Sequence, residues 1–121
     1  MATGTGKTYA IADAGQTMTQ QSAVLGTAHY LSPEQARGEV VDSRSDLYST
    51  GCLLYELLTG RPPFTGESPV SIAYQHVSET AVPPSQLDPA VPVAVDSIVM
   101  TALAKAPADR YQTAAEFRAD V

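Results

Sequence analysis

Residues 43–59 form the strongest predicted helix of the chain, and their composition limits the folds that can contain it. Gly60 follows as a helix stop signal, and Glu56 is the only charged residue after Asp46. The apolar side chains surround the whole helix and are Leu47, Tyr48, Cys52, Leu53, Leu54, Tyr55, Leu57 and Leu58. Such a helix is buried on most of its sides. A domain of 121 residues seldom encloses a helix so fully, so we expect this one to belong to a larger structure.

A short helix is predicted before the central one. Ser32 suits its N-cap, and Pro33 suits its first position, where the missing N–H would have no partner. Gln35 can complete a capping box, and Gly38 can end the helix in a left-handed conformation. Ser68, with Pro69 at the first helical position, predicts a similar start for another helix.

The remaining segments extend the helical pattern. Residues 78–92 contain four prolines and are expected to form a long irregular connection. From about Val93, apolar residues recur at helical spacing and predict an amphipathic helix that Pro107 ends. A capping box at residues 113–116 starts a last helix. Residues 1–31 are expected to be loop, and no strand is predicted. The chain is therefore predicted to be mainly α, with about five helices around the central one.

Charge and cysteine content exclude several classes of function. The formal net charge is −6 without any Lys or Arg run, so nucleic acid and anionic membrane surfaces are poor partners. The longest apolar run, residues 52–55, is too short to span a bilayer, and no signal peptide is recognised. Cys52 is the only cysteine, and His29 and His76 lie far apart, so no disulfide or metal site is predicted. We expect a cytoplasmic protein.

The stretch GTGKT at residues 4–8 suggests a separate hypothesis. Its last three residues end like a phosphate-binding loop, in which Lys7 would reach the phosphates and Thr8 would hold Mg²⁺. That loop requires a glycine five positions before Gly6, where this chain has Met1, and a preceding buried strand. A P-loop NTPase fragment stays an alternative, and loss of ATP binding in a Lys7→Ala variant would support it.

Four motifs resemble, in order and spacing, the C-terminal lobe of eukaryotic-type serine/threonine protein kinases. GTAHYLSPE at residues 26–34 resembles the end of the activation segment, with Ser-Pro-Glu in place of Ala-Pro-Glu. DLYSTG at residues 46–51 resembles the start of the family's central buried helix. LTGRPPF at residues 58–64 and APADRY at residues 106–111 resemble the loop after that helix and the Pro-x-x-Arg element near the domain end.

Further detail resembles the actinobacterial Pkn-type receptor kinases most closely, notably in residues 30–36 and 73–77. The resemblance covers roughly residues 11–121, which would form a partial kinase domain from the activation segment to a truncated last helix. Residues 1–10 have no counterpart and are expected to be a disordered N-terminal arm. The implied fold is the set of helices of a kinase C-lobe, without the N-lobe.

The resemblance implies structural roles for several residues. Glu34, beside Ser32 and Pro33, would form a buried pair with Arg110, although each could instead be a solvated surface charge. An Arg fork can bind a carboxylate through two hydrogen bonds and hold distant segments together. Asp46 faces the positive end of its helix. The resemblance adds that Asp46 holds the catalytic loop of the family, and Gly51 belongs to the same motif.

Other residues would lie on the substrate side or carry regulation. Gly26, Thr27 and Tyr30 would belong to the substrate-side loop. Thr27 resembles the threonine that hydrogen-bonds the catalytic Asp, although it could be an ordinary turn hydroxyl. The phosphorylation candidates are Thr17, Thr19 and Ser22, since a phosphate there would order the segment by pairing with Arg. Thr19 aligns with one expected phosphothreonine, whereas Gln21 occupies the place of the second.

The motifs with which this family handles ATP do not occur in the 121 residues. These are the Gly-rich loop, the strand Lys, the His-Arg-Asp loop and the Asp-Phe-Gly triplet. Asp13 is no substitute, because Phe-Gly does not follow it. The full family domain uses ATP and Mg²⁺, but we expect this chain to bind neither cofactor and to be an inactive fragment. A natural truncation, a start-site error and a recombination junction remain open as its origin.

A non-catalytic interaction module is the other class of function. The helix from Pro69 and residues 78–92 would bind a docking partner or complement a separate chain, and the helix from Pro69 could also contact a protein substrate. A pull-down with the isolated chain would separate this module from an inert truncated product. Loss of the partners that normally bury residues 46–59 would leave apolar area exposed. Exposed area of that kind favours self-association.

Overall fold

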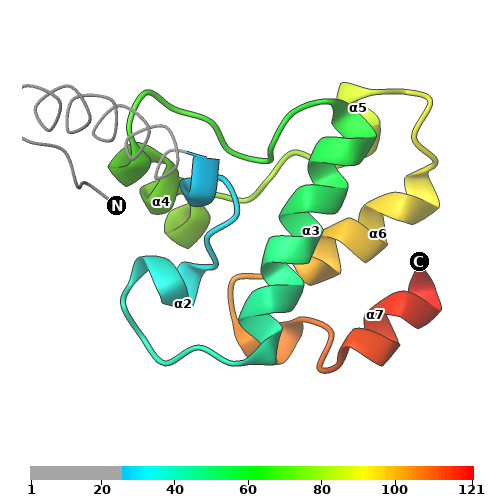
Figure 1. Cartoon of the computed structure of the whole chain (residues 1–121). Helices are drawn as coiled ribbons and strands as arrows, with labels where there is room; N and C mark the ends of the chain where they lie inside the picture. Colours follow the sequence, from blue (N-terminus) through cyan, green and yellow to red (C-terminus); the bar gives the residue numbers. More distant parts are fainter. Residues whose placement is uncertain (1–25) are drawn as a thin grey trace, which may run out of the picture.

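A computed structural model describes residues 26–121 of the chain, and this part is built from helices and loops without a strand (Figure 1). Residues 26–28 are helical, and the later elements are α2 (Pro33–Ala36), α3 (Ser43–Thr59), α4 (Pro69–Ser78), α5 (Pro84–Leu87), α6 (Val93–Ala102), the 3-10 helix η1 (Pro107–Asp109) and α7 (Ala114–Asp120). The predicted arm, the GTGKT stretch and the candidates Thr17, Thr19 and Ser22 lie outside the described residues. The prediction of a mainly helical fold without strands is confirmed for residues 26–121.

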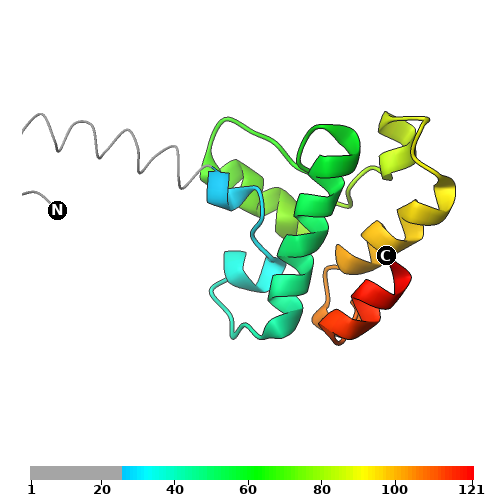
Figure 2. The same ribbon diagram turned by 45° about the vertical axis from the view of Figure 1, so that its right-hand side comes forward.

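Helix α3 stands at the centre, with α2 and α4 on one side and α5, α6 and α7 on the other (Figures 1 and 2). Asp42 caps its N-terminus by accepting from the Arg44 N–H at 2.8 Å. Gly60 ends it with φ 84°, a left-handed conformation that glycine adopts without steric cost. One face of α3 forms the main core with α4 and α6. Fully buried members of this core are Tyr48, Cys52, Tyr55, Ile72 and Val99.

Helix α2 has the predicted caps. The Ser32 hydroxyl accepts from the Gln35 N–H at 3.2 Å, and the Gln35 side chain accepts from the Ser32 N–H at 2.9 Å. Gly38 follows with φ 71°. These caps fix the direction in which the chain enters α2 from residues 26–31. Glu34 lies in this helix and points toward the start of α3, where the Ser45 hydroxyl contacts it.

Three details of the C-terminal half differ from the predictions. Residues 78–92 are not wholly irregular, because they contain α5, whose first turn is held by the Asp96 carboxylate accepting from the Ser85 N–H at 2.9 Å. Helix α6 ends at Ala102, before Pro107 is reached. At α7, Thr113 caps the helix as expected, but the Glu116 side chain binds the N–H of Gln112 instead of that of Thr113.

The central helix is buried or half-buried on most of its sides, as expected, but one stripe that includes apolar side chains is exposed in the part of the chain that the structure describes. The side chains of Leu53 and Leu57 are 48% and 75% exposed. They line an apolar groove of about 460 Å³ between α3 and α7, to which Phe117 and Val121 contribute. The second expectation, that apolar area of this helix would be left exposed, agrees with this groove.

Gly51 is required where α3 crosses α6. A Cβ at this position would lie 2.8 Å from the Cβ of Ala102 and 3.2 Å from Cδ2 of Leu103. A Gly51→Val variant is therefore expected to lose about 3 kcal/mol of unfolding free energy in urea titrations, because the two helices must separate. Thr50→Val, which places a valine at an exposed neighbouring position, should change the unfolding free energy by only about 0.5 kcal/mol. Equal losses in both variants would contradict the close approach.

Candidate functional site

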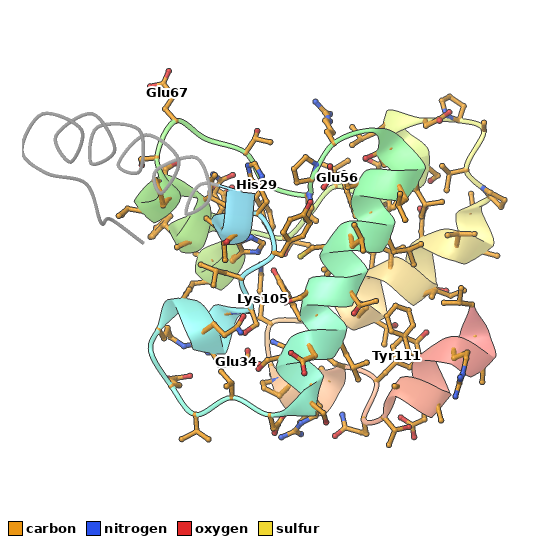
Figure 3. All side chains as sticks on the ribbon, viewed as in Figure 1. His29, Glu34, Glu56, Glu67, Lys105 and Tyr111 are labelled. Carbon is orange, nitrogen blue, oxygen red and sulfur yellow. The ribbon has the colours of Figure 1, made fainter. Side chains whose placement is uncertain are left out.

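A buried ion pair joins Glu34 of α2 to Arg110, which directly follows η1. Nη1 of Arg110 donates to Oε2 of Glu34 at 2.6 Å, and Nη2 donates to Oε1 at 2.7 Å. The two side chains are 4% or less exposed. The Ser45 hydroxyl of α3 donates a third hydrogen bond to the Glu34 carboxylate at 2.6 Å. Two segments 76 residues apart are thus fastened beside the start of α3, where Figure 3 labels Glu34.

Arg110 also fastens the backbone around it. Its Nε donates to the Ala104 carbonyl at 2.7 Å, and Nη2 donates to the Lys105 carbonyl at 3.0 Å. Its Nη1 reaches the carbonyl of Arg44 in the first turn of α3 at 3.1 Å. One guanidinium therefore connects α2, α3 and the chain after α6. Only a planar fork with five donors can do this, so lysine could not replace it.

The environment of Glu34 fixes its charge. Burial on its own would raise the pKa of this carboxyl, but the hydrogen bonds from Arg110 and Ser45 outweigh burial and hold the pKa at about 2. This folded-state pKa lies below the ordinary value of 4.5. The stability that the ionised Glu34 contributes is therefore fully present above pH 4.5 and is lost as the pH falls toward 2.

The charge of the Glu34 carboxylate can be checked by measuring the unfolding free energy as a function of pH. We expect the unfolding free energy of the wild-type chain to fall between pH 4.5 and about 2 more steeply than that of a Glu34→Gln variant, which has no carboxyl to protonate. Glu39→Gln, at an exposed position of the following loop, should keep the wild-type slope. Identical slopes in wild type and Glu34→Gln would contradict the assignment.

The substrate-side candidates lie together at the start of the described chain. Thr27 is exposed, and its carbonyl accepts from the Tyr30 N–H at 3.0 Å. The Tyr30 hydroxyl donates to the carboxylate of Glu56, and this hydrogen bond raises the pKa of Tyr30. The Ser49 hydroxyl donates to the Tyr30 carbonyl at 2.6 Å. Residues 26–31 are thereby held against α3, with the Thr27 side chain facing outward.

Asp46 stands apart from this arrangement. It lies in the first turn of α3 and is exposed, and its carboxylate makes no hydrogen bond to another described residue. Asp42, not Asp46, caps the helix. The position of Asp46 leaves the carboxylate accessible to a group outside residues 26–121.

Sequence reasoning missed a polar cluster behind the ion pair. The Arg110 guanidinium lies 4.9 Å from the ring centroid of Tyr48, and the Tyr48 hydroxyl is 2.7 Å from Nδ1 of His76. Nζ of Lys105 donates to the His76 carbonyl at 2.8 Å, which satisfies the C-terminal end of α4, and lies over the Phe64 ring. Burial lowers the pKa of Lys105 to about 8. No local motif signals these contacts, because they join four separate segments.

Within residues 26–121 no group of three or more His, Cys, Asp or Glu side chains could hold a metal ion. None of the helices there is long and apolar enough to cross a bilayer.

Comparison with known proteins gives consistent matches. A family model described as "Protein kinase domain" matches residues 9–119. Serine/threonine-protein kinase PknB of Mycobacterium tuberculosis is 63% identical over 112 residues, which cover 93% of this chain and 18% of the relative. The proteins of the same name from Mycolicibacterium smegmatis and Mycobacterium leprae are also 63% identical, with the same coverage. The chain thus spans less than a fifth of the length of these relatives.

Proposed function

Because this chain belongs to the protein kinase family, we propose that it provides the substrate-side surface of a serine/threonine protein kinase. The activity proposed for the larger protein is transfer of the ATP γ-phosphate to Ser or Thr of other proteins. The observation that carries the proposal is the buried Glu34–Arg110 pair, which fastens residues 26–34 to the base of the helical lobe. We assign residues 11–121 to the partial kinase domain and residues 1–10 to a separate arm. The family match over residues 9–119 supports these bounds to within two residues.

The chain alone supplies none of the charge neutralisation that phosphoryl transfer needs. That reaction depends on a Lys and Mg²⁺ at the phosphates and on an Asp base at the substrate hydroxyl. The corresponding motifs do not occur in the 121 residues. We therefore propose that the isolated chain is inactive and contributes by positioning the protein substrate.

Individual roles follow from position. We propose that Gly26, Thr27 and Tyr30 border the bound substrate, which the outward-facing Thr27 and the fastening of Tyr30 to α3 support. Asp46 would hold the catalytic loop of the complete enzyme, and its exposed carboxylate supports that role. Phosphorylation of Thr17, Thr19 or Ser22 would order the activation segment.

A chimera tests the proposal. Residues 11–121 would replace the corresponding segment of the M. tuberculosis relative, and phosphate transfer from labelled ATP to a protein substrate would be measured. We expect the chimera to transfer phosphate and the isolated chain to transfer none. A Thr27→Ala chimera should lose activity, whereas Thr50→Ala, at an exposed site on α3, should keep it. A folded chimera that binds ATP without transferring phosphate would contradict the proposal.

Two protein-binding surfaces complete the proposal. Val70 and Tyr74 are 79% and 67% exposed and lie one turn apart on α4, so we propose this face as the docking site for a protein partner. The groove between α3 and α7 would mediate self-association of the isolated chain. Capture of a partner that a Tyr74→Lys variant no longer binds would support an interaction module.

The single, buried Cys52 supports a reducing, cytoplasmic setting.

A further inference from the structure

We propose that His76 is a protonation-sensitive connection that holds α4 against α3 and residues 26–31, so that acidification loosens α4. This proposal is independent of the kinase activity proposed above. His76 is the last buried residue of α4, and none of its surface is exposed. Its ring meets Tyr48 of α3 at a centroid distance of 5.5 Å and Phe64 of the preceding loop at 5.1 Å. Two segments besides α4 itself therefore pack on this imidazole.

The hydrogen bonds around the ring suit the neutral form. Nδ1 is 2.7 Å from the Tyr48 hydroxyl, whereas Nε2 is buried without a hydrogen-bond partner among the described residues. Whichever nitrogen carries the proton of the neutral ring, a protonated imidazole adds a full positive charge that can donate to the Tyr48 hydroxyl only through Nδ1, while its Nε2–H has no hydrogen-bond acceptor among the described residues. An unsatisfied buried donor on a charged group is costly, so protonation opposes the packed arrangement.

The charges that face His76 act in the same direction. Lys105, from the chain after α6, binds the carbonyl of His76 itself, and Arg110 lies behind the Tyr48 ring. His29, from residues 26–31, disfavours a further positive charge, as does Lys105. On α3 the titratable neighbours are Tyr48 and Cys52, both neutral because burial raises the pKa of each. The carboxylate of Glu34 is already paired with Arg110.

The direction of the pH effect follows from these contacts. Burial, together with Lys105, lowers the pKa of His76 to about 4; the backbone of Ala28 and His29 partly favours the charged form but is not in hydrogen-bonding geometry with Nε2. Because the packed-state pKa lies below the ordinary value of 6.5, the packed form is fully favoured above pH 6.5 and loses stability as the pH falls toward 4. Between pH 7.5 and pH 5 the packing equilibrium should fall roughly 30-fold.

Hydrogen exchange of the α4 amides tests the proposal on the full chain. Protection factors, corrected for the intrinsic pH dependence of exchange, should fall roughly 30-fold from pH 7.5 to pH 5 in the wild type. In His76→Phe, which keeps an aromatic ring that cannot be protonated, they should change less than about threefold. His29→Gln, which removes the only other histidine, should behave like the wild type. A 30-fold loss that persists in His76→Phe would overturn the proposal.

A second measurement does not depend on the folding of His76→Phe. In the His29→Gln chain, His76 is the only histidine, so its ring signals in an NMR titration are assigned without ambiguity. We expect these signals to remain those of a neutral imidazole until the α4 amides lose protection. An imidazole that takes up its proton near pH 6.5 while α4 stays protected would show that charge is tolerated in the packed state and would overturn the proposal.

Discussion

Replacing Arg110 with methionine is expected to lower the free energy of unfolding by about 3–5 kcal/mol, the usual cost of removing one partner of a buried ion pair. The Glu34 carboxylate would keep its burial and lose both charge-assisted hydrogen bonds from the guanidinium. The carbonyls of Ala104 and Lys105 would lose their donor as well. Urea unfolding followed by circular dichroism at pH 7 measures the loss.

Two further variants separate the pair from ordinary packing. Arg118→Met, at an exposed position of α7, makes the same chemical change outside the ion pair and should cost about 0.5 kcal/mol or less. The double variant Glu34→Gln with Arg110→Met should be less destabilised than the sum of the single variants, because no unpaired charge is left buried. Strict additivity would mean that the two side chains act independently, contrary to their bidentate contact.

The helix ends could be predicted because their signals are local. Ser32 and Gln35 cap α2 through atoms three residues apart, and Gly60 ends α3 with its own backbone conformation. Helix α5 was missed for the opposite reason. Its prolines indicated loop, while the carboxylate that holds its first turn, that of Asp96, comes from the next helix.

Long-range contacts were accessible only through the resemblance to protein kinases. Glu34 and Arg110 are 76 residues apart, and nothing in composition or periodicity connects them. The motif spacing of the family suggested the pair, but it gave no hint of the cluster behind it. Nothing in the sequence marks His76 as a buried residue, and only the packing of α4 on α3 shows why it is one.

The exposed side of α3 shows what composition alone leaves undetermined: its apolar residues could be predicted, but the burial of each of them could not. Leu53 and Leu57 belong to an apolar helix, yet they face the groove and not the core. Helical periodicity says which side chains share a face, but it does not say whether another segment covers that face.

Charging this face is expected to weaken the self-association that we propose for the isolated chain. In a Leu53→Lys, Leu57→Lys double variant, two ammonium groups would have to be desolvated in any contact that covers the groove. The association constant measured by sedimentation equilibrium should fall at least about 10-fold, which corresponds to about 1.4 kcal/mol. The fold should survive, because both side chains are substantially exposed in the single chain.

The face of α4 provides the matched control. Val70→Lys with Tyr74→Lys adds the same two charges to another exposed apolar pair, 79% and 67% accessible. If the groove of α3 and α7 is the contact surface, this variant should associate like the wild type. If association is lost in the α4 variant and kept in the α3 variant, the groove is not the contact surface and the docking face of α4 binds a second copy instead. Unequal responses are informative because both variants change the formal net charge from −6 to −4, so a general charge effect would alter association to the same extent in each.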